Sequence, residues 1–193
     1  DEKNAIDITK NLIKKIQKPS ENKFVNNGSS PRFDKNEILG IIPSNLKKPF
    51  DIRELVKRFV DKSEYTEFKE NYGRTMFCCW TQISGYPVGV IANNGVIFIE
   101  SARKATNFIQ LANKSNTPIL FIHNTTGFMV GKRYEQSGMI NSGSQLIHAV
   151  SGSTVPHISL QVGNSYGAGN YAMCGRSFDP RFLFSYPNVK SGV

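Results

Sequence analysis

Residues 118–131 read PILFIHNTTGFMVG and residues 156–170 read PHISLQVGNSYGAGN, and these two stretches decide the fold. Each begins with a short apolar run, at 118–122 and at 156–162, that is typical of a buried strand. Each run leads into a loop rich in Gly and small polar residues, at 123–131 and at 163–170. The repeated order of strand and loop indicates two equivalent positions in one sheet.

The segments around these runs alternate between strand and helix patterns. Strands are predicted at 75–83 and 86–92, joined by a hairpin turn at Ser84-Gly85. A helix is predicted over 101–116, and another between the two buried strands. The apolar face of the first helix holds Ala102, Ala105, Phe108, Ile109 and Ala112, and that of the second holds Leu146, Ile147 and Val150. This alternation predicts an α/β fold with a parallel sheet flanked by helices, and ligands of such sheets bind beyond the C-terminal ends of the strands.

The N-terminal quarter of the chain has a different character. A short amphipathic helix is predicted over 5–17, and Ser, Asn, Gly and Pro over 20–49 are typical of an exposed linker. From Phe50 onward an amphipathic helix begins, with Asp51 near its start. We therefore predict a helix and linker over 1–48 and one packed domain over 49–193.

Composition excludes several classes of protein. The 193 residues are 39% hydrophobic, enough for one core, and the apolar runs are far shorter than the roughly 20 residues that cross a bilayer. The net charge of +9 is spread along the chain without the clustering that nucleic acid binding requires. The 3 cysteines have no metal-ligand spacing, so we expect buried apolar thiols and no metal site. The chain lacks an initiator Met and a charged-then-apolar leader, which suggests a piece of a longer protein without a targeting signal.

The loop 163–170 permits several interpretations. Its glycines do not have the Gly-x-Gly-x-x-Gly spacing of a dinucleotide site, and no Lys follows as in a phosphate loop. Gly163-x-Ser165-x-Gly167 matches a nucleophile elbow, with Ser165 as a hydrolase nucleophile. All three histidines precede Ser165, so the Ser-acid-His order of that fold is incomplete. Alternatively, small residues at 167–169 open a helix and expose N–H groups to an oxyanion, or they only allow tight packing.

The loop 123–131 holds two glycines and the apolar pair Phe128-Met129. Gly127 and Gly131 permit backbone conformations closed to other residues. Phe128 and Met129 either offer apolar surface to a flat ligand or cap the core. His123, at the strand end, is more often a satisfied rim residue than a base. The sequence leaves both alternatives open.

Several segments resemble the carboxyltransferase β subunits of biotin-dependent acyl-CoA carboxylases, over about residues 33–193. The segments are PFDIRELVKRFVD (49–61), EFKENYG (67–73), GYPVGVIANNGVIF (85–98), HNTTGFMVG (123–131) and GNSYGAGNYAMCGRSFDPRF (163–182). The two loops are most similar to the methylcrotonyl-CoA type, with geranyl-CoA carboxylase as a near neighbour. The resemblance implies a crotonase-like carboxyltransferase C-domain, the second of two in the complete subunit and incomplete at its C-terminus.

The resemblance also implies a reaction. Carboxybiotin releases CO2, biotin takes a proton from the γ carbon of an unsaturated acyl-CoA, most often 3-methylcrotonyl-CoA, and the dienolate attacks CO2. By analogy with the family, the N–H groups of Ala168 and Gly169 stabilise the biotin oxyanion. Gly127, Phe128, Tyr166 and Gly167 shape the biotin pocket. Biotin arrives on a partner α subunit that carries biotin carboxylase, and the thioester hole belongs to another copy of the carboxyltransferase subunit.

The sequence departs from the family pattern in places. Asn164 stands where Gly is common, Ala105-Thr106 where Lys-Gly-Thr is usual, and the chain stops at Val193, before a Met-Gly-Gly segment. Because the last departure leaves the second domain incomplete, we expect no turnover by the 193 residues alone. A non-catalytic or truncated relative, or a propionyl-CoA enzyme, remains an alternative. We expect the mitochondrial matrix if the source is eukaryotic and the cytoplasm if it is bacterial.

Overall fold

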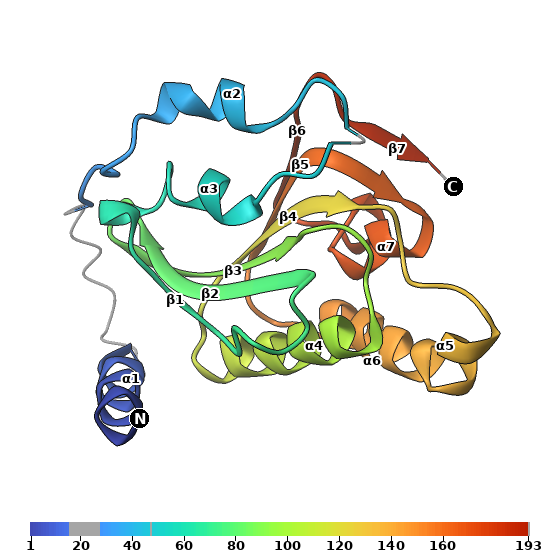
Figure 1. The fold of residues 1–193 in the computed structure, drawn as a ribbon, viewed down its shortest axis with the longest axis horizontal. Coiled ribbons are helices and arrows are strands. Elements are labelled where there is room, and N and C mark those ends of the chain that lie inside the picture. Colours follow the sequence, from blue (N-terminus) through green and yellow to red (C-terminus); the bar gives the residue numbers. More distant parts are fainter. Residues whose placement is uncertain (16–27, 47, 193) are drawn as a thin grey trace.

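A single mixed sheet organises the computed structural model, which describes residues 1–15, 28–46 and 48–192 (Figure 1). In this described part the sheet has seven strands in the order β1-β2-β3-β4-β5-β6, with β7 beside β5. The strands are β1 (Tyr65–Glu67), β2 (Met76–Ile83), β3 (Tyr86–Asn93), β4 (Ile119–Thr125), β5 (His157–Tyr166), β6 (Phe182–Ser185) and β7 (Lys190–Gly192). Strands β3, β4, β5 and β6 run parallel to one another, while β1, β2 and β3 pair antiparallel, so the predicted α/β class is confirmed.

Helices cover both faces of the sheet. In Figure 1, α4 and α6 lie below the sheet, and α2 and α3 lie above it. The α-helices are α1 (Glu2–Lys15), α2 (Ile38–Ile41), α3 (Ile52–Val56), α4 (Ile99–Lys114), α5 (Lys132–Gln136), α6 (Met139–Ser151) and α7 (Gly167–Ala172). Short 3-10 helices are η1 (Lys35–Glu37), η2 (Asp61–Ser63) and η3 (Arg176–Phe178). The molecule is therefore a three-layer sandwich of helix, sheet and helix.

Alternation along the strands divides the core in two. On β4, Ile119 and Phe121 join the cluster under α4 and α6, while Ile122 joins the cluster under α3. Successive side chains of a strand point to opposite faces of the sheet. A continuous apolar run therefore predicts a strand that is buried on both faces. The predicted apolar face of α4 is confirmed, because all five of its residues are fully buried.

The hairpin between β2 and β3 also agrees with the sequence. Ser84 and Gly85 both have positive φ, 52° and 82°, as a two-residue turn between twisted strands requires. All three cysteines are free and buried, as expected.

The structure differs from the predictions mainly at the ends of the chain. The stretch 20–49, predicted to be a linker without a continuous element, contains η1 and α2, and Ile42 packs into the core. Residues 20–27 and 47 lie outside the described residues, as do residues 16 and 17 of the helix predicted over 5–17. Strands β1, β6 and β7 were not predicted, because they are short and polar or partly exposed. The boundary between 1–48 and 49–193 stays a prediction.

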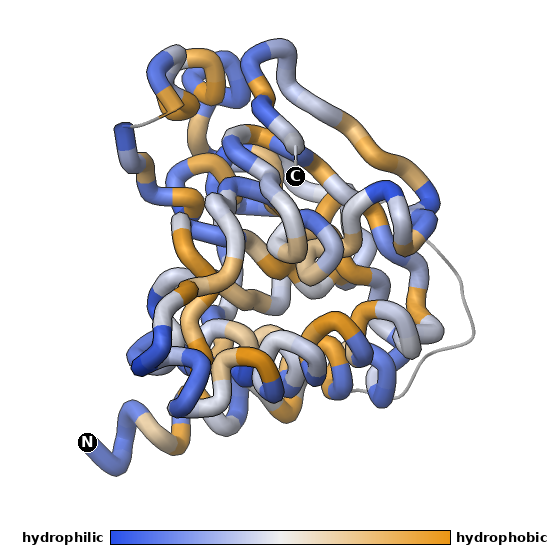
Figure 2. Tube along the Cα trace, turned by 90° about the vertical axis from the view of Figure 1, so that its right-hand side faces the viewer, coloured by the Kyte–Doolittle hydropathy of each residue, from blue (hydrophilic) through white to orange (hydrophobic). Residues whose placement is uncertain are grey.

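Apolar and hydrophilic residues are mixed along the helices and strands. Figure 2 shows apolar residues alternating with hydrophilic ones along the helices rather than gathering in one long segment. Among the described residues, no helix combines the length and apolar character needed to cross a membrane.

Candidate functional site

The two glycine-rich loops meet at the C-terminal ends of β4 and β5. These strands are parallel neighbours, and Thr125 stands in register with Ser165. A Cβ atom on Gly169 would lie 2.9 Å from the Cα of Gly127 and 3.1 Å from a methyl carbon of Thr125. Only glycine fits at position 169 without moving the other loop, so the two segments singled out from the sequence form one site.

The first loop is held by backbone hydrogen bonds. The N–H of Ile97 donates to the carbonyl of Gly127 at 2.9 Å, and the N–H of Met129 donates to the carbonyl of Ile97 at 2.9 Å. The N–H of Gly127 donates to Oγ1 of Thr125 at 3.1 Å. Gly127 has φ of +115°, a conformation that L side chains rarely adopt. The loop is therefore fixed in place, and glycine is required at its centre.

Phe128 and Met129 are half-buried and pack against the core cluster under α4 and α6. The Phe128 ring lies over α6, where a Cβ on Gly143 would be 3.3 Å from it. The ring of Phe128 therefore caps the core, which was one of the two alternatives for this apolar pair. Val130 is the apolar side chain of this loop that projects into solvent, with 75% of its surface exposed.

The second loop differs from its predicted form. Strand β5 continues to Tyr166, and α7 begins at Gly167 and spans only six residues. Its N-cap, Tyr166, contributes no side-chain hydrogen bond, and the first N–H groups of any helix lack intrahelical acceptors. Ala168 is exposed and Gly169 is buried. Because so short a helix has a small dipole, individual N–H groups, rather than the dipole, determine what this segment can bind.

Gly167 occupies the turn into α7. Its φ is +49°, in the left-handed region, and a Cβ at this position would meet no atom within 4 Å. Tyr166 and Gly167 are half-buried beside the exposed Ala168. The structure therefore places the predicted residues Tyr166, Gly167, Ala168 and Gly169 in one continuous turn, with open space at Gly167.

A buried Ser–His pair lies directly behind this turn. The Oγ of Ser165 is 2.9 Å from Nδ1 of His123, and Nδ2 of Asn170 donates to the same Oγ at 2.8 Å. Sequence reasoning missed the pair, because His123 precedes Ser165 and the expected triad order places the His later. The register between β4 and β5 was the signal that could have found it.

This pair does not support the nucleophile-elbow interpretation. Ser165 and His123 are both fully buried, and within the described residues no carboxylate hydrogen-bonds to His123. Burial lowers the pKa of His123 to about 4, which makes it a weak base near neutral pH. A hydroxyl bonded on two sides and closed to solvent lacks the access that a nucleophile needs.

The depressed pKa of His123 predicts a pH-dependent stability. The pKa of about 4 lies below the unfolded value near 6.5, so the contribution is complete above pH 6.5 and is lost as the pH falls toward 4. We expect a contribution of about 3 kcal/mol to the difference in unfolding free energy between pH 7 and pH 4. In denaturant titrations at several pH values, the free energy of unfolding of His123→Asn should therefore fall less between pH 7 and pH 4 than that of the wild type. His148→Asn, at an exposed site on α6, is the control; equal slopes in all proteins would contradict the prediction.

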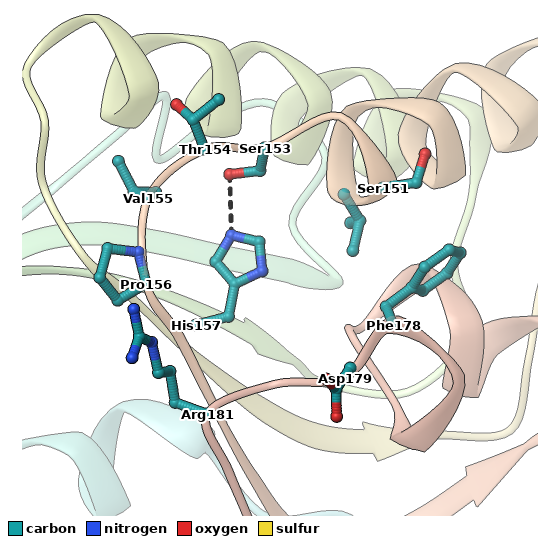
Figure 3. A pocket seen from close by; sticks show the side chains of 10 residues that line it. Ser151, Ser153, Thr154, Val155, Pro156, His157, Phe178, Asp179 and Arg181 are labelled. Carbon is teal, nitrogen blue, oxygen red and sulfur yellow. Dashed lines mark hydrogen bonds between the residues drawn. The ribbon is translucent and has the colours of Figure 1, made fainter.

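Two cavities flank the sheet. One of about 210 Å³ lies at the start of β5, at the opposite end of the strand from the loops (Figure 3). There Nε2 of His157 is 2.8 Å from the Oγ of Ser153, and Nδ1 is 3.3 Å from the Sγ of Cys174. Because both ring nitrogens are already partnered, His157 is not free to act as a base in this cavity. The other cavity, of about 360 Å³, adjoins α7 and is lined in part by Ser165, Gly167, Asn170, Tyr171 and Arg176.

Comparisons with known proteins agree with this geometry. The family model described as carboxyl transferase domain matches residues 1–193. A probable biotin-dependent acyl-coenzyme A carboxylase beta2 subunit of Mycobacterium tuberculosis is 52% identical and covers 100% of this chain and 37% of that protein. The methylcrotonoyl-CoA carboxylase beta chain, mitochondrial, of Dictyostelium discoideum is 45% identical, with 100% of this chain and 33% of that protein covered.

Solved structures show the same fold. The geranyl-CoA carboxylase beta subunit of P. aeruginosa superposes with a TM-score of 0.83 at 47% identity. The match covers 92% of this chain and 34% of that one, so the chain spans about a third of the length of its relatives. The crotonase-like fold implied by the resemblance is thereby confirmed. On the match along its whole length, the chain belongs to the carboxyl transferase domain family.

Proposed function

We propose that this chain contributes the biotin-facing half of a site that transfers a carboxyl group from carboxybiotin to an unsaturated acyl-CoA. The substrate that we favour is 3-methylcrotonyl-CoA, because the 45% identical Dictyostelium relative is named for it. The observation that carries the proposal is the backbone contact between Gly127 and Gly169, where an added Cβ would be 2.9 Å from the opposite Cα. This contact brings together the two loops that resemble the family.

The residues fit biotin in a specific way. Space is open at Gly167, Ala168 has only a methyl group, and Tyr166 is half-buried beside them. The N–H groups of Ala168 and Gly169 would donate to the biotin carbonyl, with Gly127, Phe128, Tyr166 and Gly167 forming the walls. For Phe128 the wall is its backbone, because its ring packs toward α6. Bound carboxybiotin supplies the carboxyl group.

The contribution of the chain itself is electrostatic. Two N–H donors held in fixed positions stabilise negative charge as it develops on an oxygen, and they need no reorganisation during the reaction. Removal of one such donor typically costs about 10²- to 10³-fold in rate. The titratable side chain that pairs with Ser165 behind the turn, His123, is buried and neutral near pH 7. The proposed chemistry therefore uses the backbone rather than a side-chain acid or base.

Partners follow from the same proposal. A biotin-carrying α subunit would deliver the carboxyl group, and a further copy of the carboxyltransferase subunit would hold the thioester. The Dictyostelium relative is named as mitochondrial. For this chain the compartment stays a prediction, the mitochondrial matrix in a eukaryote and the cytoplasm in a bacterium.

The proposal is tested with the full protein that carries these residues, assembled with its biotin-carrying partner. Labelled bicarbonate, ATP and one acyl-CoA are supplied, and incorporation of label is measured for 3-methylcrotonyl-CoA, geranyl-CoA and propionyl-CoA. We expect the highest kcat/KM with 3-methylcrotonyl-CoA and no incorporation when avidin blocks biotin. Geranyl-CoA is the second candidate, favoured by the 47% identity to a geranyl-CoA carboxylase. Absence of biotin-dependent labelling with every substrate would support a non-catalytic relative instead.

A further inference from the structure

We propose that His123, Ser165 and Asn170 form a buried relay that positions the N–H donors of Ala168 and Gly169. This inference rests on the proposed function above and assigns no contact with substrate to the three side chains. They are positioning residues, each on a different element: His123 on β4, Ser165 at the end of β5 and Asn170 on α7. The relay thus joins the two central strands of the site to the short helix that bears the donors.

The relay has a definite direction. The amide nitrogen of Asn170 can only donate, so the Oγ of Ser165 accepts at 2.8 Å. The hydroxyl proton of Ser165 is then available for Nδ1 of His123, which lies 2.9 Å away. With Nδ1 as an acceptor, neutral His123 carries its proton on Nε2, a tautomer assigned from this network. In this arrangement Asn170 donates, Ser165 both accepts and donates, and His123 accepts. The Nε2 atom of His123 is buried and has no hydrogen-bond partner among the described residues.

The Asn170 amide is also held from the opposite side. Its Oδ1 occupies the place of a side chain on Gly175, where an added Cβ would be only 1.8 Å away. The N–H of Gly175 donates to the carbonyl of Asn170 at 2.9 Å. Position 175 therefore needs a glycine to admit the amide in the orientation that reaches Ser165.

A tether is needed because the donor segment is intrinsically flexible. Ala168 lies between Gly167 and Gly169, and glycine has the largest conformational freedom of any residue. Asn170 follows Gly169 directly, so fixing its side chain limits the rotation of α7 relative to the sheet. Misplacement of a reacting group by about 1 Å can cost about 10²-fold in rate. Hydrogen bonds between buried polar groups, such as those that Ser165 makes with His123 and Asn170, contribute this rigidity.

The chain offers a matched pair of substitutions. Ser159 lies on β5 like Ser165, six positions earlier, and both side chains are fully buried. The Ser159 hydroxyl donates at 2.6 Å to the carbonyl of Cys174, which lies beyond the C-terminal end of α7 and outside the donor turn at 166–169. Ser165→Ala and Ser159→Ala thus each remove a buried, hydrogen-bonded hydroxyl from β5, but only the first breaks the relay.

A second pair tests the histidine. The amide of Asn places an oxygen near the position of Nδ1, so His123→Asn keeps an acceptor for Ser165. His123→Leu removes it while filling the space. If the relay matters through this hydrogen bond, Asn restores the function that Leu loses, although Asn leaves more empty volume.

The experiment measures two quantities in the full protein assembled with its biotin-carrying partner. For Ser165→Ala and His123→Leu we expect kcat to fall about 10²-fold with the KM for acyl-CoA unchanged, and faster hydrogen exchange over residues 166–172. Ser159→Ala and His123→Asn should match the wild type within about threefold in kcat, a margin well below the loss that misplacement causes. A structural role alone would affect Ser159→Ala and Ser165→Ala alike.

The outcomes separate this inference from the proposed function. Unchanged exchange in Ser165→Ala overturns the relay, and so does faster exchange with unchanged kcat. An equal loss of kcat in Ser159→Ala also overturns it. If the wild type transfers no carboxyl group, the proposed function fails, and hydrogen exchange alone then decides whether the relay holds α7.

Discussion

Ala168→Leu is expected to lower the rate of carboxyl transfer by about 10²- to 10³-fold while leaving the free energy of unfolding nearly unchanged. Ala168 is exposed at the start of α7, so a larger side chain causes no clash in the core. A leucine there would cover the N–H groups of residues 168 and 169 and block the approach of a carbonyl oxygen. The assay is biotin-dependent incorporation of labelled bicarbonate, alongside denaturant unfolding.

Two controls isolate the effect at position 168. Ala168→Gly leaves the approach open and should retain most of the rate, although glycine in a helix costs up to about 1 kcal/mol. Ala5→Leu adds the same side chain at an exposed position of α1 and should change neither rate nor stability. Wild-type turnover by Ala168→Leu would remove the oxyanion assignment.

The sequence was sufficient for the parts of the fold that depend on local patterns. Runs 118–122 and 156–162 became β4 and β5, and the helix predicted over 101–116 became α4 at Ile99–Lys114. The proximity of the two loops also followed, because parallel strands end at the same edge of a sheet. The predicted site residues consequently lie in or beside one turn. Their roles toward biotin stay predictions.

The contacts that could not be predicted join side chains from segments that are distant in the sequence. The Ser165–His123 hydrogen bond spans 42 positions and requires the register of two strands. Lys104 is a second example. It lies on the buried face of α4, but the sequence pattern assigned only apolar residues to that face. It is fully buried and 3.7 Å from Glu67, which also pairs with Arg53. Burial lowers the pKa of Lys104, and no local pattern around it indicates that an ion pair exists.

The other large effect is expected at Gly169, where both stability and rate should fall. A Cβ there would lie 2.9 Å from the Cα of Gly127, a backbone atom that cannot move aside as a flexible side chain could. The loop 127–129 cannot yield easily, because Ile97 holds it through two hydrogen bonds of 2.9 Å. For Gly169→Ala we expect an unfolding free energy lower by about 1–3 kcal/mol. Displacement of the adjacent donors should lower the rate by about 10²- to 10³-fold.

Gly40→Ala provides the matched control, because no atom lies within 4 Å of the added methyl group. Gly40 is exposed within α2, so alanine should leave the rate unchanged and stabilise the protein by up to about 1 kcal/mol through its helix propensity. The same substitution of glycine by alanine is thus predicted to change the free energy of unfolding in opposite directions at the two positions.

Ala168→Leu and Gly169→Ala also differ from each other. Both should lose activity, but only the glycine variant should lose stability. If Gly169→Ala has the same free energy of unfolding and the same rate of carboxyl transfer as the wild type, the contact between the loops does not determine the geometry of the site.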